Sequence, residues 1–230
     1  MAKTRSTNLN PAQMARRIEI GEERRARTRD KLLEAAYALF AVHGAEAPTI
    51  DDVIAKAGVA RGTFYNHFET RDDLFRAVAN DIATAINTLI LEAERQIRDP
   101  VVRIAIAFRM FVDFATADPA RGWILLRTMP LVGSLNGEMS SKIRLQFQEA
   151  LSTGRLKVQS LNTAIDIGLG LQVMTIRRIL TDGDEERAIL DAVQALLIAL
   201  GLDAEDAAKM AALPIAAAHL SAPGRRGVAA

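Results

Sequence analysis

The stretch TIDDVIAKAGVARGTFYNHF, residues 49–68, constrains this chain more than any other. Thr49 stands at an N-cap position, and Asp52 three residues later completes a capping box with Asp in place of Glu. Apolar residues then recur at helical spacing, which predicts a short helix with one buried face, at Ile50, Val53, Ile54 and Ala57. Gly58 follows, where a left-handed backbone stops a helix and allows a sharp turn. The pattern therefore predicts a helix that ends at a tight turn.

A second short helix is expected from about residue 60 to residue 68. Phe64 and Phe68 are one turn apart, so both rings should point inward. The tip and outer face then carry hydrogen-bonding groups with little apolar bulk, namely Arg61, Gly62, Thr63, Tyr65, Asn66 and His67. A helix of this kind fits the major groove of DNA. The alternative interpretation is an ordinary helical hairpin with a polar face.

The segment GVARGTFYNHFETRDDLF resembles the recognition-helix signature of the TetR family of transcriptional regulators. The matching positions are Gly58, Val59, Gly62, Thr63, Phe64, Tyr65, His67, Phe68, Arg71 and Leu74. Ala60 stands where a Ser often caps the second helix, which predicts a weaker or shifted start. Arg71 stands where Lys is usual, which keeps the positive charge. The resemblance covers roughly residues 27–75, and the rest of the chain agrees with the family in length and helicity.

The resemblance also implies a division of labour on DNA. Carried onto the matching positions, it places four residues against phosphates: Thr49, Tyr65, His67 and Arg71. It directs four others toward base edges: Arg61, Gly62, Thr63 and Asn66. Side-chain chemistry agrees with this division, because Arg61 can pair with guanine O6 and N7 and Asn66 with adenine N6 and N7.

Composition excludes several other functions. The chain of 230 residues is 50% hydrophobic and 25% charged, which is typical of a globular protein. It has no cysteine and only three widely separated histidines, so we expect no disulfide and no metal site. Phosphate-cradling glycine loops, zincin motifs and nucleophile elbows are missing, so we expect neither an enzyme nor a cofactor. Apolar runs are short and no secretory signal is visible, so the simplest location is cytoplasmic and no membrane partner is expected.

Charge is unevenly placed along the chain. The net charge is only +1, but residues 1–31 hold nine basic and four acidic residues, a net charge of +5. A basic arm beside a helix-turn-helix suggests contact with phosphates or with the minor groove. A solvated, partly disordered tail is the alternative, and both hold if the arm orders only on DNA.

The remaining periodicity predicts an all-α fold with an N-terminal helix-turn-helix DNA-binding domain and a C-terminal helical ligand-binding and dimerisation domain. We expect a first firm helix at about 24–43 and a linking helix from Thr70 almost to Asp99. The expected divisions are a flexible basic arm at 1–23, a DNA-binding domain at 24–75, a ligand-binding and dimerisation domain at 76–215, and a disordered tail at 216–230.

The segment from about Pro100 to Leu180 is the candidate ligand-binding core. Its aromatic and methionine side chains suit an apolar pocket, with Phe108, Phe111, Trp123, Met129, Phe147 and Met174 as candidate ligand contacts. Polar groups that could orient a ligand are Arg109, Asp113, Gln146, Gln172 and Thr175. The same apolar residues would also serve as plain core, and Arg109 with Asp113 as a surface pair. That a pocket exists at all is implied by the family resemblance.

Two helices, at about 162–180 and 184–200, carry more apolar surface than one core needs. The first is apolar nearly all round, so it should be buried on every side. Paired across a two-fold axis, the two helices would form a four-helix interface in a homodimer.

The function predicted is that of a ligand-responsive DNA-binding regulator, a repressor released from a palindromic operator by a small apolar or amphipathic effector. Its expected partners are double-stranded DNA, that small molecule and a second copy of the chain. The alternative is a DNA-binding protein regulated by a protein partner with no small-molecule ligand. An apolar cavity between the core helices would favour the first hypothesis, and a solid core with an exposed apolar patch would favour the second.

Overall fold

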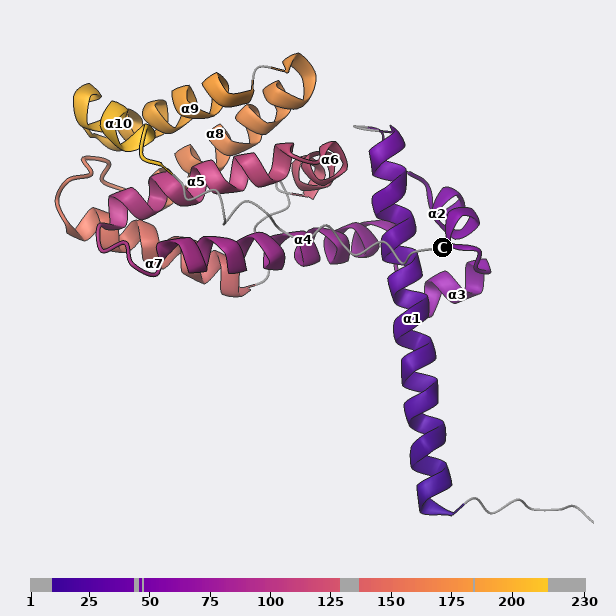
Figure 1. Cartoon of the computed structure of the whole chain (residues 1–230). Helices are drawn as coiled ribbons and strands as arrows, with labels where there is room; N and C mark the ends of the chain where they lie inside the picture. Colours follow the sequence, from indigo (N-terminus) through magenta and orange to yellow (C-terminus); the bar gives the residue numbers. More distant parts are fainter. Residues whose placement is uncertain (1–9, 44–45, 47, 129–136, 184, 215–230) are drawn as a thin grey trace, which may run out of the picture.

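The computed structural model describes residues 10–43, 46, 48–128, 137–183 and 185–214, and this part of the chain forms ten helices and no strand (Figure 1). The helices are α1 (Pro11–His43), α2 (Ile50–Ala57), α3 (Arg61–Tyr65), α4 (Arg71–Glu94), α5 (Pro100–Thr116), α6 (Pro119–Thr128), α7 (Gly137–Ser152), α8 (Leu161–Asp182), α9 (Glu185–Leu200) and α10 (Ala204–Ala211). The predicted all-α fold is confirmed.

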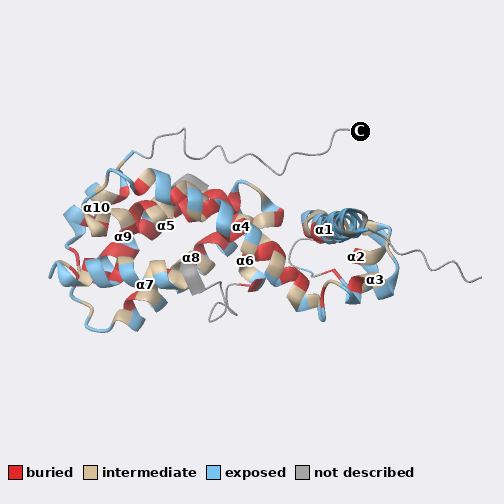
Figure 2. Ribbon diagram, turned by 90° about the horizontal axis from the view of Figure 1, so that it is seen from below, coloured by how far each residue is buried: buried red, intermediate tan, exposed pale blue. Residues whose placement is uncertain are grey.

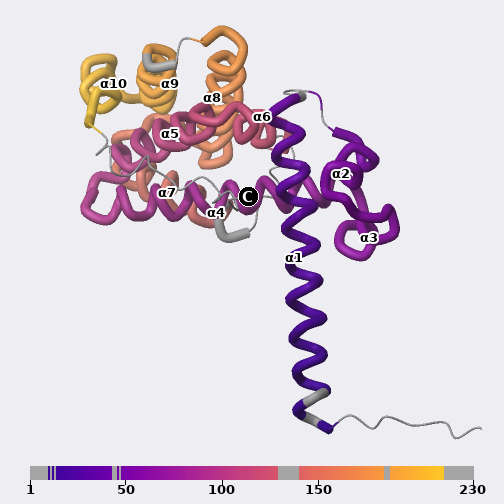
Figure 3. Tube along the Cα trace, turned by 45° about the vertical axis from the view of Figure 1, so that its right-hand side comes forward, coloured from indigo at the N-terminus to yellow at the C-terminus, as the bar shows by residue number. Residues whose placement is uncertain are grey.

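The helices form two groups that α4 joins. Helices α2 and α3 lie on one side of α1, and α5 to α10 lie on its other side (Figures 1 and 3). Helix α4 packs against α1 and runs on into the second group, where it packs against α5. Helix α6 contacts both α1 and α4. The arrangement gives the two groups a mechanical connection through α4 and α6.

Local side-chain bonds fix where the helices begin. Thr70 caps α4 in a capping box with Asp73, which confirms the predicted start of the linking helix. The Asp99 carboxylate accepts hydrogen bonds from the backbone N–H groups of Val101 and Val102, with Pro100 in the first turn of α5. Such caps depend on neighbouring residues alone, so the sequence is sufficient to place them.

Helix α1 begins at Pro11 and not near Arg24, so the predicted start of the first helix was wrong. Ala, Gln, Met, Arg and Glu predominate between these positions, and all are good helix formers. The described side chains before residue 28 are exposed and give no apolar stripe, which is the signal on which the prediction depended. This part of α1 extends beyond every other helix (Figures 1 and 3).

Helix α4 ends at Glu94, earlier than predicted. The chain tightens there into a turn, in which the Ile97 N–H donates to the Glu94 carbonyl at 2.9 Å. Among the described residues, α4 alone is long and apolar enough to cross a membrane, and 44% of its most apolar window is buried inside the protein. A core helix passes the same test, so this helix gives no argument for a membrane.

Buried residues form one continuous cluster through both groups of helices (Figure 2). Helix α8 departs from the prediction that it is buried on every side, because Met174 is 58% exposed in a single chain. Ile198 of the neighbouring α9 is 43% exposed. The predicted tail at 216–230, Met129 and the first nine residues of the predicted arm lie outside the described part of the chain.

Candidate nucleic-acid interface and internal cavity

The turn between α2 and α3 is built as the sequence predicts. The Thr49 hydroxyl accepts from the Asp52 N–H at 3.2 Å, and the Asp52 carboxylate accepts from the Thr49 N–H at 2.8 Å. Gly58 adopts a left-handed backbone with φ of 66°, which residues with a side chain rarely adopt. Its neighbour Val59 donates to the Ile54 carbonyl at 3.1 Å, so the chain turns sharply into α3.

Helix α3 is shorter than predicted, because it ends at Tyr65 and not at Phe68. Its N-cap, Ala60, offers no side-chain hydrogen bond to the first turn, as the replacement of a capping Ser predicts. After Tyr65 the backbone tightens, with the His67 N–H donating to the Phe64 carbonyl at 2.9 Å. Phe64 and Phe68 are both buried, with ring centroids 5.9 Å apart, which confirms that they point inward.

Six of the eight residues assigned to DNA lie on α3 or directly after it, whereas Thr49 is the N-cap of α2 and Arg71 is the first residue of α4. Most are exposed, namely Thr49, Arg61, Gly62, Tyr65 and Asn66, and the others, Thr63, His67 and Arg71, are half-buried. Arg61 forms an exposed ion pair with Asp51 at 2.9 Å. A bond with Tyr65 and the charge of Asp51 raise the pKa of Arg61 above its ordinary value. Nothing lies within 4 Å of where a Cβ of Gly62 would be, so this side of the helix is open to close approach.

Helix α1 adds two cations to this surface that the sequence interpretation did not single out. The Arg25 guanidinium donates to the Asn66 carbonyl at 3.3 Å, and the Arg29 guanidinium lies 5.5 Å from the centre of the Phe68 ring. Burial, and then the charges of Arg25 and Arg29, lower the pKa of His67. The two arginines are four residues apart and so share one face of α1, which is the signal that could have found them.

Helix α6 joins the candidate interface to the rest of the chain. The Tyr37 hydroxyl of α1 donates to the Asp118 carboxylate just before α6, and burial followed by this bond raises the pKa of Tyr37 to about 12. Arg121 of α6 lies 3.8 Å from the centre of the Phe114 ring of α5 and donates to the Phe114 carbonyl at 2.6 Å. These contacts fix α6 between α1 and α5.

The second feature is a partly open cavity of about 90 Å³ between α4, α5, α7, α8 and α9. Its wall is mainly apolar and includes three of the predicted ligand contacts, Phe108, Phe111 and Phe147. The polar residues of the wall are Asn87, Lys142, Gln146 and Gln172, of which the sequence predicted the two glutamines.

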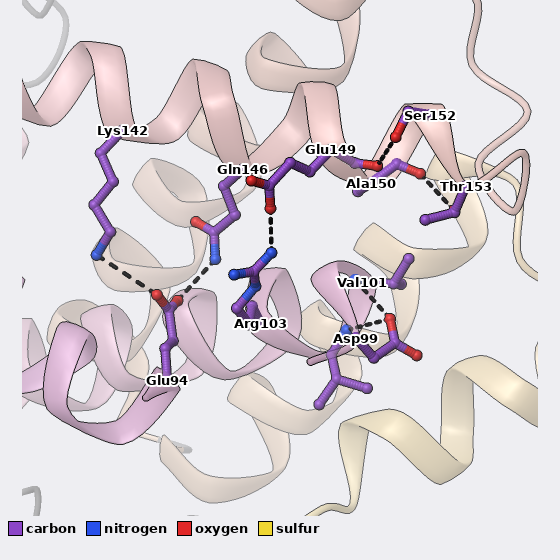
Figure 4. A network of polar contacts seen from close by, with 11 residues as sticks. Glu94, Asp99, Val101, Arg103, Lys142, Gln146, Glu149, Ala150, Ser152 and Thr153 are labelled. Atoms are coloured by element: carbon purple, nitrogen blue, oxygen red, sulfur yellow. Dashed lines mark hydrogen bonds and ion pairs between the residues drawn. The ribbon is translucent and has the colours of Figure 1, made fainter. Parts of the chain in front are cut away.

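A partly buried ion pair lies at the polar part of this wall (Figure 4). Glu94 is only 9% exposed, and its carboxylate accepts from the Gln146 amide at 2.7 Å and lies 3.6 Å from the Lys142 ammonium. The same ammonium donates to the Asn87 side chain at 3.1 Å. Burial raises the pKa of Glu94 and lowers that of Lys142, so both shifts oppose the charged forms.

The remaining candidate ligand contacts lie elsewhere. Trp123 is on α6 and does not belong to the cavity wall, and Met174 is on the exposed side of α8. The Arg109 guanidinium lies 3.9 Å from the Asp113 carboxylate and donates to the Leu213 carbonyl at 3.0 Å, so Arg109 links α5 to the end of the described chain. Thr175 is buried but also lies away from the cavity. Periodicity alone could not separate these positions, because several faces of these helices are apolar.

Comparison with known proteins matches two parts of the chain to family models. Residues 32–78 match the family model "Bacterial regulatory proteins, tetR family", and residues 99–213 match "Tetracyclin repressor-like, C-terminal domain". The chain is 36% identical over 56 residues to the HTH-type transcriptional repressor KstR2 of Mycolicibacterium smegmatis, covering 24% of this chain and 27% of that protein. It is 33% identical over 70 residues to the HTH-type transcriptional repressor BepR of Brucella suis biovar 1, covering 30% and 34%.

These matches span about a third or less of each relative's length. A solved structure covers far more of the chain. The crystal structure of RolR in complex with the ligand resorcinol is 25% identical and aligns with a TM-score of 0.69, covering 85% of this chain and 98% of that one.

Proposed function

Since the chain belongs to the TetR family of bacterial regulatory proteins, we propose that it is a transcriptional repressor whose affinity for DNA changes when a small molecule binds. One observation carries the proposal: a helix-turn-helix with a polar outer face is joined by α4 to a helical domain that contains a partly open apolar cavity. We place the division between the two domains near residue 75, inside α4. The proposal includes a cytoplasmic location and no enzymatic activity.

On DNA, α3 enters the major groove and the residues around it set its register. Arg61, Gly62, Thr63 and Asn66 face the base edges. Thr49, Tyr65, His67 and Arg71 contact phosphates, which positions the helix without reading sequence. The exposure of Arg61 and Asn66 and the open space beside Gly62 support this assignment. Arg25 and Arg29 extend the positive surface along α1.

The functional unit is a two-fold symmetric dimer formed through α8 and α9. The exposed apolar side chains of Met174 and Ile198 on these helices support this interface, because a partner would cover them. Two copies of α3 must then be about 34 Å apart to enter successive major grooves on one side of the duplex.

The effector is a small apolar or amphipathic molecule that occupies the cavity. Support comes from the apolar wall and from the solved structure of the related RolR, which holds resorcinol. A regulator controlled only by a protein partner needs no such space, so the cavity favours the small-molecule hypothesis. Asn87 and Ile90 of α4 belong to the wall, so an occupant that spreads the wall displaces the helix that leads to the DNA-binding domain.

The effector changes DNA affinity only through its different affinities for the two conformations. The test begins with selection of bound duplexes from a random DNA pool by the full-length protein. We expect a palindromic site, and lower affinity for that site in the presence of a ligand that binds the cavity. Selection of no sequence, or of a site without two-fold symmetry, would contradict the proposal.

A further inference from the structure

The cavity combines an apolar wall with one compact polar area. Lys142 and Gln146 are one turn apart on α7, so both side chains reach the cavity from the same face of that helix. Both also contact Glu94, which is not itself part of the wall. Figure 4 shows the two side chains converging on this carboxylate.

Lys142 and Gln146 can each form a further hydrogen bond beyond these contacts. An ammonium has three donors; Lys142 donates one hydrogen bond to Asn87, and Glu94 is its ion-pair partner at 3.6 Å. The Gln146 amide gives one N–H to Glu94, and its carbonyl oxygen has no described contact. The polar area thus offers a donor and an acceptor side by side. A hydroxyl group both donates and accepts, so one hydroxyl can satisfy both.

The charges around the cavity favour a ligand with a hydroxyl group over a ligand with a carboxylate. Glu94 and Lys142 already neutralise each other, and the neighbouring Arg103 is paired with Glu149 (Figure 4). A carboxylate ligand would bring a further negative charge into a partly buried site whose positive and negative charges already balance, and such a charge is costly. The opposed pKa shifts of Glu94 and Lys142 agree that the site disfavours net charge.

Size limits the apolar part of the ligand. The cavity of about 90 Å³ is smaller than the roughly 150 Å³ cavity that is known to accept benzene. A single ring therefore fits only when the surrounding side chains move slightly apart. Phe108, Phe111 and Phe147 supply apolar surface for such a ring.

We propose that the cavity takes a small neutral ligand, one ring bearing a hydroxyl group, with the hydroxyl against Lys142 and Gln146. The inference rests on the proposed function, in which the cavity is the effector site. It adds the chemical class of the ligand and the residues that select it.

The test is calorimetry on the full-length protein without DNA, using phenol, toluene and benzoate as probes of similar size. Phenol should bind at least about tenfold more tightly than toluene, the effect of a hydrogen bond to a charged group, and more tightly than benzoate. Equal binding of phenol and toluene, tighter binding of benzoate, or binding of none at millimolar concentration overturns the inference.

Two variants and one control variant identify the residues that select the ligand. Lys142→Met should remove the advantage of phenol over toluene, and Lys209→Met, on the exposed side of α10, should leave it unchanged. Glu94→Gln should raise the affinity for benzoate relative to phenol by about tenfold, because it removes the nearest negative charge. Because Glu94→Gln hardly changes the shape of the side chain, it still tests the inference if Lys142→Met fails to fold. No shift toward benzoate in Glu94→Gln contradicts the charge argument.

DNA plays no part in these measurements, so the two proposals fail separately. Sequence-specific DNA binding without a preference for hydroxyl-bearing ligands would overturn only the inference. A preference for phenol in a protein that selects no DNA site would overturn the regulatory function and leave the ligand class standing.

Discussion

His67 lies half-buried beside α3, within the field of Arg25 and Arg29, and its pKa is lowered in the free protein. A phosphate contact would favour the imidazolium and raise that pKa, so DNA binding takes up protons. Affinity should therefore increase as the pH falls from about 8 toward 6, and it should level off once the free protein is also protonated. His67→Gln should flatten this dependence in a titration of DNA binding at several pH values. An unchanged pH dependence in the variant would remove His67 from the phosphate contacts.

Replacing a base-reading residue and replacing a phosphate-binding residue should have different effects on DNA binding. Arg61→Ala or Asn66→Ala should cost about 1–3 kcal/mol and relax preference at one base position per half-site. Arg71→Ala should weaken binding to all sequences alike. The number of counterions released on DNA binding should fall by about one for each phosphate contact that is lost. Arg95→Ala, at the far end of α4, serves as the control.

These variants are to be measured on single-base changes of the selected operator at several salt concentrations. A changed base preference in Arg71→Ala, with none in Arg61→Ala and Asn66→Ala, would reverse the assignment of roles. The sequence could supply this assignment because the eight positions lie within a short local motif. The spacing of Arg25 and Arg29 indicates that they share one face of α1, but only the structure places that face beside α3, because this depends on how α1 packs.

At the scale of helices, α1 and α6 pack against each other, and the bond from Tyr37 to Asp118 adds a polar link between them. Tyr37→Phe removes a half-buried hydrogen bond to a charged group, so we expect a loss of about 1–2 kcal/mol in the free energy of unfolding. DNA binding without effector should persist, and the release produced by effector should become smaller, because α6 is held less firmly to α1. Urea unfolding measures the loss of stability, and titration of the protein–DNA complex with effector measures the release from DNA. Unchanged release would show that the bond between Tyr37 and Asp118 plays no part in the coupling.

Helix boundaries show what a sequence can specify. The capping boxes at Thr49 and Thr70 join neighbouring residues, and both helix starts were predicted correctly. The projecting half of α1 buries no stripe, so periodicity missed it. The cavity lies among five helices, and its wall depends on their packing. Periodicity therefore found Phe108, Phe111 and Phe147 but could not exclude Trp123 or Met174.

For the whole molecule, the predicted dimer depends on α8 and α9. Met174→Glu places a charge at the centre of the proposed interface without disturbing the core, since this side chain is 58% exposed in one chain. Sedimentation at micromolar concentration should show dimers for the parent protein and monomers for this variant. Leu145→Glu, equally exposed at 60% but on α7, should stay dimeric. Dissociation by Leu145→Glu alone would move the interface to α7.

The coupling between cavity and DNA is tested most directly by the dissociation constant for the selected operator, measured with and without a ligand that calorimetry shows to bind the cavity. The ligand should raise this constant by roughly 5- to 150-fold, the range of typical allosteric couplings, and the operator should weaken ligand binding by the same factor. An operator affinity that is unchanged while the cavity is occupied would contradict ligand-responsive regulation.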